Sequence, residues 1–214
     1  MHLQIKQENP WLHIPVREYE AHMRAPSVGQ KQMLDAVFRD LLHQHPPEYL
    51  AVLGCTAGNG FDLIDWQHIT RVTGFDINDA YLRLAMRRFA RYSHKMEFRC
   101  CDVGSCNLGQ NAFDLIHGAL IFEYIPLQPA IHHIFQAMKK HGLFSAVLQM
   151  PHESLSMVSK TRYQSLEKLA GIMTLHDPDY FRRTAAESRL KEIKHRYMVL
   201  ESGKPFYWGL YQKI

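Results

Sequence analysis

Short segments with strand character alternate with longer segments of helical periodicity through the middle of the chain. Five of the short segments are predicted strands: 49–53, 71–75, 96–100, 113–117 and 143–148. Apolar residues that recur every three or four positions predict helices at 29–43, after Asn78 and from Pro129. Lys139, Lys140 and Gly142 are expected at the carboxyl-terminal end of the helix that starts at Pro129. A further helix is expected to start at 61–66. This alternation predicts a parallel sheet with helices on both faces.

The carboxyl-terminal part of the chain changes character. Helical segments are expected within 160–172 and 178–189, followed by strands at about 191–200 and 205–213. Only 201–204 separates these two strands, and so short a connection makes them antiparallel.

Composition places this pattern in one α/β domain with a small extension, since the chain has 214 residues, of which 46% are hydrophobic and 21% charged. We expect a cytoplasmic protein, because the amino terminus has no signal-peptide character and no apolar run approaches the ~20 residues of a membrane span. The net charge of +4 is spread along the chain, so no nucleic-acid partner is expected. The four cysteines are predicted to be free thiols, and the 14 scattered histidines predict no metal site. The oligomeric state does not follow from the sequence.

A glycine-rich turn, Gly54-Cys55-Thr56-Ala57-Gly58-Asn59-Gly60, follows the first predicted strand. Ligands bind at this place in such sheets, because glycines let the backbone approach the ligand and a following helix offers free N–H groups. The dinucleotide pattern G-x-G-x-x-G fails here, since Gly58-x-Gly60 would require a small residue at Leu63. The turn therefore favours a different nucleoside-containing ligand.

Two carboxylates follow the next two predicted strands. Asp76 ends the second strand, where an acidic side chain can accept hydrogen bonds from ribose hydroxyls. Asp102 follows the third, where it can accept from the exocyclic amine of adenine while Val103 packs on the ring. Either aspartate alone can equally be a turn or cap residue. Their occurrence at successive strand ends, together with the glycine turn, favours a binding site.

These motifs resemble the class I S-adenosylmethionine-dependent methyltransferase family over residues 28–213. The resemblance lies in 53–60, 73–77, 101–103, 113–118 and the terminal strand pair. It implies a Rossmann-like three-layer sandwich whose seven-stranded, mostly parallel sheet has only its last strand antiparallel. It also implies S-adenosylmethionine as cofactor, with these binding residues: Gly54, Cys55, Thr56, Gly58, Asp76, Ile77, Asp102, Val103 and Gly118.

The chain departs from the family pattern at two positions. Val52 stands where the family usually has an acidic residue that helps to hold the methionine amine, a role that carbonyls near Gly54 and Gly118 can take. Thr56 replaces the middle glycine, so a β-branched side chain lies where the backbone should approach the ligand. Its hydroxyl can instead contact the methionine carboxylate.

Catalytic candidates lie in two segments. Glu123 and Tyr124 follow the fourth predicted strand and would face the acceptor; the alternative is that Glu123 caps a turn and Tyr124 packs the core. Residues 1–27 are expected to form an extension that closes over the domain 28–214, with Tyr19 and His22 on one helix face. The alternative is a helix packed on the sheet edge.

The function expected from these features is transfer of a methyl group to a small-molecule acceptor. Alignment of the acceptor with the methyl group supplies most of the rate, and a base is needed only where a proton must leave. Two alternatives stay open: a methyltransferase acting on protein or RNA, and a non-catalytic sensor of S-adenosylmethionine or a related nucleoside.

Overall fold

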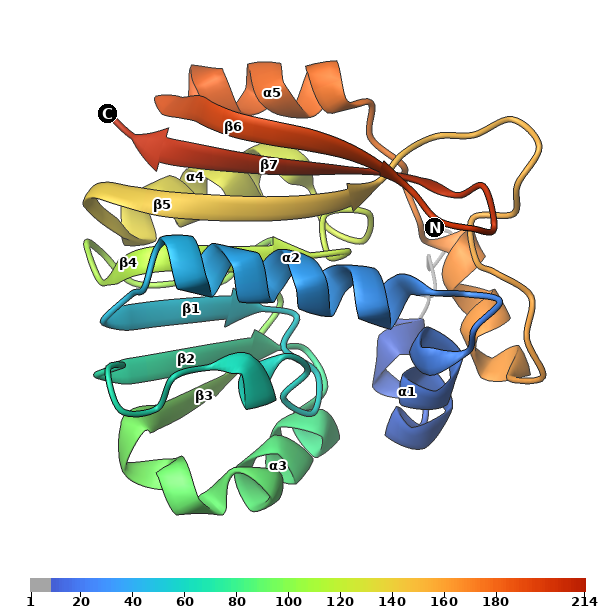
Figure 1. Ribbon diagram of the computed structural model, residues 1–214, viewed down its shortest axis with the longest axis horizontal. Coiled ribbons are helices and arrows are strands. Elements are labelled where there is room, and N and C mark those ends of the chain that lie inside the picture. Colours follow the sequence, from blue (N-terminus) through green and yellow to red (C-terminus); the bar gives the residue numbers. More distant parts are fainter. Residues whose placement is uncertain (1–8) are drawn as a thin grey trace, which may run out of the picture.

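The computed structural model describes residues 9–214, and its centre is a single seven-stranded sheet (Figure 1). The order of strands across the sheet is β3-β2-β1-β4-β5-β7-β6. Their bounds are β1 (Tyr49–Leu53), β2 (Arg71–Asp76), β3 (Met96–Cys100), β4 (Phe113–Ala119), β5 (Met138–Gln149), β6 (Leu190–Val199) and β7 (Pro205–Lys213). All seven predicted strands are present.

Only β7 runs against the other strands. It pairs antiparallel with β5 on one side and with β6 on the other, whereas β1 to β5 pair in parallel. The predicted topology is confirmed. The order reverses at β1, because β2 and β4 flank it, and the carboxyl ends of these three strands form the crevice in which such sheets bind ligands.

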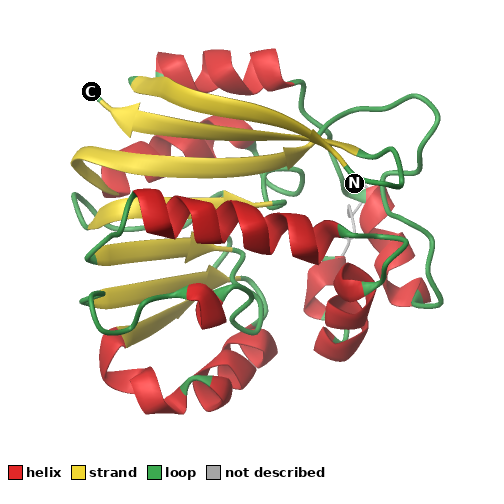
Figure 2. Ribbon diagram, viewed as in Figure 1, coloured by secondary structure: helices red, strands yellow, loops and turns green. Residues whose placement is uncertain are grey.

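Helices cover both faces of the sheet (Figure 2). Five α-helices are described: α1 (Val16–Arg24), α2 (Gln30–Gln44), α3 (Asp79–Arg88), α4 (Leu127–Ala137) and α5 (Pro178–Glu187). Alternate residues of β1 point to opposite faces: Leu50 and Val52 lie in one core with α2 and α3, and Ala51 and Leu53 lie in the other with α4 and α5. This is the three-layer arrangement that the alternating pattern predicted.

The end of α4 differs from the prediction. The helix stops at Ala137, and Lys139 and Lys140 belong to β5 instead of the last helical turn. The pairing of β4 with β5 shifts register after Phe113, and a Cβ on Gly142 would lie 3.0 Å from the Phe113 carbonyl oxygen. Gly142 therefore marks a strand irregularity that needs close backbone contact, not a helix stop.

The prediction of a helix that starts at Phe61 is also wrong. Only a three-residue 3-10 helix, η2 (Phe61–Leu63), follows the glycine turn, and the chain is extended again at Ile64. The segment expected to be helical within 160–172 forms a 3-10 helix, η4 (Gln164–Gly171), whereas the helix expected at 178–189 is confirmed as α5. The glycine turn consequently presents its own backbone N–H groups and no α-helix N-terminus.

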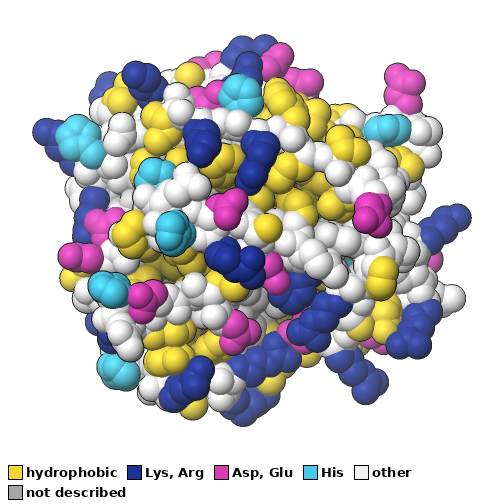
Figure 3. Space-filling view, in the orientation of Figure 1, with side chains coloured by type: hydrophobic (Ala, Val, Ile, Leu, Met, Phe, Trp, Pro, Cys, Tyr) yellow, Lys and Arg dark blue, Asp and Glu magenta, His cyan; other side chains and the backbone are white. Residues whose placement is uncertain are grey.

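The charged residues are spread along the sequence, and one face of the molecule shows the same mixture (Figure 3). On the face shown in Figure 3, Lys and Arg side chains are interspersed with acidic, histidine and apolar groups. Within residues 9–214, no helix is both long enough and apolar enough to span a membrane.

Candidate functional site

Two adjoining cavities lie at the carboxyl ends of β1, β2 and β4, and the first contains most of the residues predicted to bind the cofactor. We call it the cofactor cavity; it takes in about 620 Å³, part of which is open to solvent. Six predicted residues line it: Gly54, Thr56, Asp76, Ile77, Asp102 and Val103. Trp11 and Tyr19 of the amino-terminal extension close it from the other side.

Asp76 joins the glycine turn to the end of β2. Its Oδ2 accepts a hydrogen bond of 2.8 Å from the backbone N–H of Thr56, and its Oδ1 accepts one of 2.8 Å from the N–H of Asn78. The side chain is buried, and this burial raises the pKa of Asp76 to about 6. Each carboxylate oxygen keeps a lone pair, so both can accept a further hydrogen bond from a diol.

Thr56 holds an uncommon conformation at the centre of the turn. Its φ is +50°, in the left-handed region that favours glycine. Its hydroxyl Oγ1 is buried and has no hydrogen-bond partner among the described residues. An unpartnered buried hydroxyl beside a cavity is a group that a polar ligand can satisfy.

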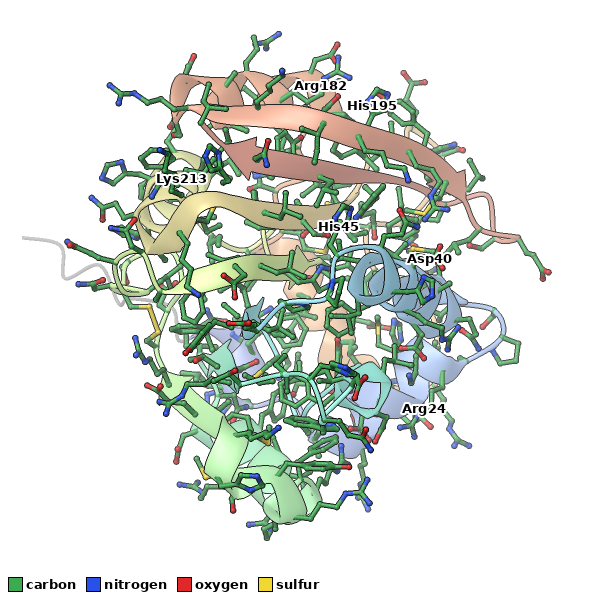
Figure 4. All side chains as sticks on the ribbon, turned by 60° about the vertical axis from the view of Figure 1, so that its left-hand side comes forward. Arg24, Asp40, His45, Arg182, His195 and Lys213 are labelled. Carbon is green, nitrogen blue, oxygen red and sulfur yellow. A yellow bond between two sulfur atoms is a disulfide. The ribbon has the colours of Figure 1, made fainter. Side chains whose placement is uncertain are left out.

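The loop after β3 forms the far wall of the cofactor cavity. Val103 is buried and Asp102 is exposed, with its Oδ1 accepting the N–H of Gly104 at 2.8 Å. Cys101 and Cys106 bridge this loop as a disulfide, visible as a yellow bond in Figure 4. The prediction that all four cysteines are free is therefore wrong; Cys55 and Cys100 are free. The turn after Asp102 brings the two Cα atoms to 6.1 Å, which spacing along the chain does not show.

Three other predicted cofactor residues do not line this cavity. Cys55 is buried and faces a neighbouring cavity described below, and burial raises the pKa of its thiol. Gly58 and Gly118 pack against aromatic rings, since a Cβ there would lie 2.5 Å from Phe89 and 2.8 Å from Phe122. The structure thus gives both glycines a packing role.

The second cavity, which we call the acceptor cavity, brings together all four predicted catalytic residues. Tyr19, His22, Glu123 and Tyr124 line a space of about 490 Å³. It adjoins the cofactor cavity, and the two share Trp11, Tyr19, Leu120 and Tyr124. In Figure 1, α1 and the segment around residue 170 lie side by side beyond the arrowheads of the parallel strands. Residues of both segments line this space.

Glu123 is the buried acid of the acceptor cavity. Its Oε1 accepts the N–H of Gln149 at 2.7 Å, and its Oε2 has no partner among the described residues. Burial raises the pKa of Glu123 to about 7. Burial and the nearby Glu123 carboxylate raise the pKa of Tyr124 above its usual range, so its hydroxyl stays protonated at neutral pH.

The amino-terminal extension is fixed in place by polar contacts. The Asn78 amide donates to the Trp11 carbonyl at 2.9 Å, and the Tyr81 hydroxyl donates to the Ile14 carbonyl at 2.7 Å. Arg88 forms an ion pair with Glu20 and donates to the Ala57 carbonyl at 3.3 Å. These contacts connect the extension to α3 and to the glycine turn.

Sequence reasoning missed Trp11 as a site residue. It packs edge-to-face on Tyr124, with ring centroids 5.2 Å apart, and on Tyr19 at 5.5 Å. The aromatic richness of the extension was the available signal. The 157–173 part of the acceptor cavity wall lies far along the chain from the strand ends that carry the motifs, so no motif connected it with the site.

A third cavity, the charged cavity, lies on the other side of Tyr19. It takes in about 670 Å³, part of which is open to solvent, and its lining includes Gly54, Cys55 and the buried His117. Four charged side chains of α1 and α2 belong to its wall: Glu20, Arg24, Lys31 and Asp35. Arg24 projects from α1 in Figure 4. Tyr19 and Gly54 line both this cavity and the cofactor cavity, so the two meet at the glycine turn.

Comparison with known proteins identifies the fold and the domain. A family profile described as a methyltransferase domain matches residues 51–142, and no curated protein matches the chain. The N-methyltransferase NodS from Bradyrhizobium japonicum WM9, solved with S-adenosylhomocysteine, is 15% identical, with a TM-score of 0.66 over 89% of this chain and 89% of that one. Geranyl diphosphate C-methyltransferase from Streptomyces coelicolor A3(2) is 13% identical, with a TM-score of 0.66 over 88% and 84%. Residues 51–142 thus match a methyltransferase domain, and the chain as a whole has the fold of S-adenosylmethionine-dependent methyltransferases.

The fold of these methyltransferases also occurs in an enzyme named for other chemistry. The [4+2]-cyclase SpnF is 14% identical, with a TM-score of 0.67 over 85% of this chain and 82% of that chain. The acceptor consequently has to be argued from the site of this chain, because fold alone does not specify the reaction.

Proposed function

We propose that the protein transfers the methyl group of S-adenosylmethionine to a small-molecule acceptor bound in the acceptor cavity. The observation that carries this proposal is the arrangement of two cavities that share the wall Trp11, Tyr19, Leu120 and Tyr124. A ligand in one cavity is thereby brought next to a ligand in the other. Such positioning is the main requirement of an in-line displacement at an already electrophilic methyl group.

The chain offers groups that suit each part of the cofactor. Asp76 would accept from the ribose hydroxyls, and Asp102 with Val103 would hold the adenine, since all three line the cofactor cavity. The methionine end would lie toward the charged cavity, whose wall includes the ion-paired Glu20 (with Arg88) and the pair Lys31–Asp35. Carboxylates from α1 and α2 would then compensate for the missing acid at Val52.

The shape of the acceptor cavity favours a small acceptor over a macromolecule. Its wall is mainly apolar with a few polar groups, as is typical of a small-molecule pocket. Its wall includes residues from α1 and from the segment 157–173, which hydrogen bond to each other through His22 and Thr161 at 3.0 Å. The geranyl diphosphate enzyme named above also has a small acceptor.

We further propose that residues 1–27 act as a lid on the domain 28–214. The described part of this extension contributes Trp11 and Tyr19 to the cofactor cavity and Tyr19 and His22 to the acceptor cavity. A lid of this kind excludes water and completes the walls of both cavities. A cytoplasmic site of action stays a prediction.

A second candidate is a non-catalytic sensor of the same cofactor. The specific observation in its favour is Thr56, whose left-handed backbone and side chain occupy a position where the family has glycine. A turn that holds the cofactor in a position unfavourable for methyl transfer could still bind it, which is all that a sensor requires.

One experiment separates these functions. Purified protein is titrated calorimetrically with S-adenosylmethionine, and then incubated with the methyl-labelled cofactor and three pools: a small-molecule extract, bulk RNA and bulk protein. We expect binding, and label that appears only in the small-molecule pool. Label in RNA or protein would replace the proposed acceptor, binding without transfer to any pool would favour the sensor, and the absence of binding would overturn both functions.

A further inference from the structure

The acceptor cavity contains a buried carboxylate oxygen without a partner. Glu123 is only 2% exposed, yet its Oε2 makes no hydrogen bond to any described residue, while its Oε1 and its main-chain carbonyl each accept one bond. The two accepted bonds come from the backbone N–H groups of Gln149 and Thr174, at 2.7 Å each. Burying a carboxylate oxygen without a donor is costly, so a group that is retained in this state indicates a ligand that supplies the donor.

The charge of Glu123 is equally uncompensated. Within residues 9–214, no lysine, arginine or histidine forms an ion pair with it. The buried Lys204 donates to the Met157 carbonyl at 2.9 Å and not to Glu123. His22 is uncharged at neutral pH, because burial and the nearby Lys204 lower its pKa. A cationic ligand would supply the positive charge that the ionised Glu123 carboxylate lacks.

The rest of the wall suits an apolar body with a cationic end. The aromatic rings of Trp11, Tyr19 and Tyr124 line the same cavity as Glu123, and aromatic faces attract a cation. The remaining lining is mainly apolar: Met23, Leu120, Met157, Val158, Leu166, Leu169 and Met173. A hydroxyl compound could fill this space, but it would leave the carboxylate without a counter-charge.

We propose that the acceptor is an apolar primary or secondary amine whose nitrogen donates to Glu123 Oε2 and loses a proton to that oxygen. This inference rests on the proposed function and names the substrate class of the same site. The amine enters as an ammonium ion, and the carboxylate pairs with it. Glu123 would then both select the acceptor and prepare it for reaction.

The step balances in atoms and charge. Glu123 takes one proton from the ammonium group, which frees the nitrogen lone pair. The nitrogen forms a bond to the methyl carbon as the carbon–sulfur bond breaks, and the electron pair of that bond stays on the departing sulfur of S-adenosylhomocysteine. The products are an N-methylammonium ion, neutral S-adenosylhomocysteine and protonated Glu123, which returns its proton to solvent.

The surroundings of Glu123 suit this proton transfer. A base whose pKa is about 7 accepts and releases protons readily at neutral pH. The other titratable groups that line the cavity are His22, Tyr19 and Tyr124. Burial raises the pKa of both tyrosines and lowers that of His22, so these groups stay neutral while Glu123 titrates.

The test compares two matched probes, hexylamine and hexan-1-ol, on protein saturated with S-adenosylhomocysteine. Their binding is followed by calorimetry and by the change in tryptophan fluorescence, to which Trp11 of the cavity wall contributes. We expect wild-type protein to bind hexylamine at least about tenfold more tightly than hexan-1-ol, the usual scale for a charge-assisted hydrogen bond. Glu123→Gln should bind both probes alike. Glu167→Gln, which changes an exposed acid on η4, is the matched control and should keep the preference.

The outcomes separate this inference from the proposed function. Equal binding of the two probes by wild type, a preference that survives in Glu123→Gln, or no hexylamine binding would overturn the amine class. Labelled transfer only to hydroxyl compounds would do the same and leave the methyltransferase function standing. If Glu123 selects amines but no amine is methylated, the proposed methyl transfer is wrong and the amine-binding site at Glu123 still stands. If Glu123→Gln does not fold, the carboxyl infrared band of wild type, which hexylamine binding should shift, supplies the same answer.

Discussion

The cofactor cavity and the acceptor cavity share a wall but are built in opposite ways. The predicted residues that line the cofactor cavity come from consecutive strand ends: Gly54 and Thr56, Asp76 and Ile77, and Asp102 and Val103. The acceptor cavity joins parts of the chain that are distant in sequence, as His22 and Thr161 show, since 139 residues separate them. One cavity follows from the sheet topology, and the other depends on how the extension and the 157–173 segment pack.

The main acidic residues of the two cavities, Asp76 and Glu123, also differ in how far the protein satisfies their hydrogen bonds. Both oxygens of Asp76 accept backbone hydrogen bonds, so this acid shapes its own cavity before any ligand arrives. Glu123 keeps one oxygen without a partner. We therefore expect Asp76 to act through preorganisation of the turn, and Glu123 to act directly on a ligand.

The largest expected effect is that of Asp76→Ala on cofactor binding. Loss of the acceptor for the ribose hydroxyls and for the Thr56 and Asn78 N–H groups should weaken S-adenosylmethionine binding by about 3 kcal/mol, roughly 100-fold. Calorimetry measures this affinity. The exposed neighbour Asp79→Ala is the control and should leave it unchanged. Undiminished binding by Asp76→Ala would remove Asp76 from the cofactor site.

The second prediction concerns pH and Glu123. Its folded pKa, about 7, lies above the ordinary 4.5, so the native state binds more protons than the unfolded state between these values. The stability of the wild-type protein relative to Glu123→Gln should therefore fall as pH rises, by roughly 2 to 3 kcal/mol between about pH 5 and pH 8. Urea unfolding of both proteins at the two pH values measures the difference.

This comparison isolates Glu123 from other buried groups. Burial raises the pKa of Asp76 to about 6 and lowers that of His117 to about 4, but both groups are present in the wild type and the variant. A stability difference that does not change with pH would mean that the Glu123 carboxylate is not held in an unfavourable environment.

Trp11 lines both cavities, so its replacement should affect the ligands of both. Trp11→Ala is expected to weaken the binding of S-adenosylmethionine and of the hexylamine probe by about tenfold each, since aromatic anchors contribute strongly to ligand affinity. Leu12→Ala, which changes an exposed neighbour, should alter neither. If only one affinity changed, the shared wall would serve a single ligand, and the lid hypothesis would narrow to that cavity.

The difference between the cavities also explains what the sequence could predict. The strands and the cluster around Asp76 were predictable, because parallel strands place their carboxyl ends at one edge and the motifs follow in order. The sequence could not show that the helix expected after Gly60 is missing, because the apolar residues at 61–66 fit a helix and also fit the turn that forms. Trp11 and the disulfide Cys101–Cys106 depend on tertiary contacts that no spacing shows.

The smallest expected effect tests the departure of the glycine turn from the family pattern. Thr56 has a φ of +50° and a buried hydroxyl without a partner, so Thr56→Gly should relieve strain and remove that hydroxyl. The greater flexibility of glycine in the unfolded chain offsets part of the gain, which leaves about 0.5 to 1 kcal/mol of added stability. Closer approach of the backbone should also tighten S-adenosylmethionine binding by about threefold, or ~0.7 kcal/mol.

Arg189→Gly provides the matched control, because Arg189 has a φ of +59° and follows α5 outside the three cavities. It should gain similar stability in a thermal melt without any change in cofactor affinity. Weaker binding in Thr56→Gly would show that the threonine hydroxyl contacts the cofactor, as the alternative role for Thr56 requires. Tighter binding would show that this methyltransferase carries at Thr56 a side chain that limits its hold on the cofactor, while Asp76 supplies most of the affinity.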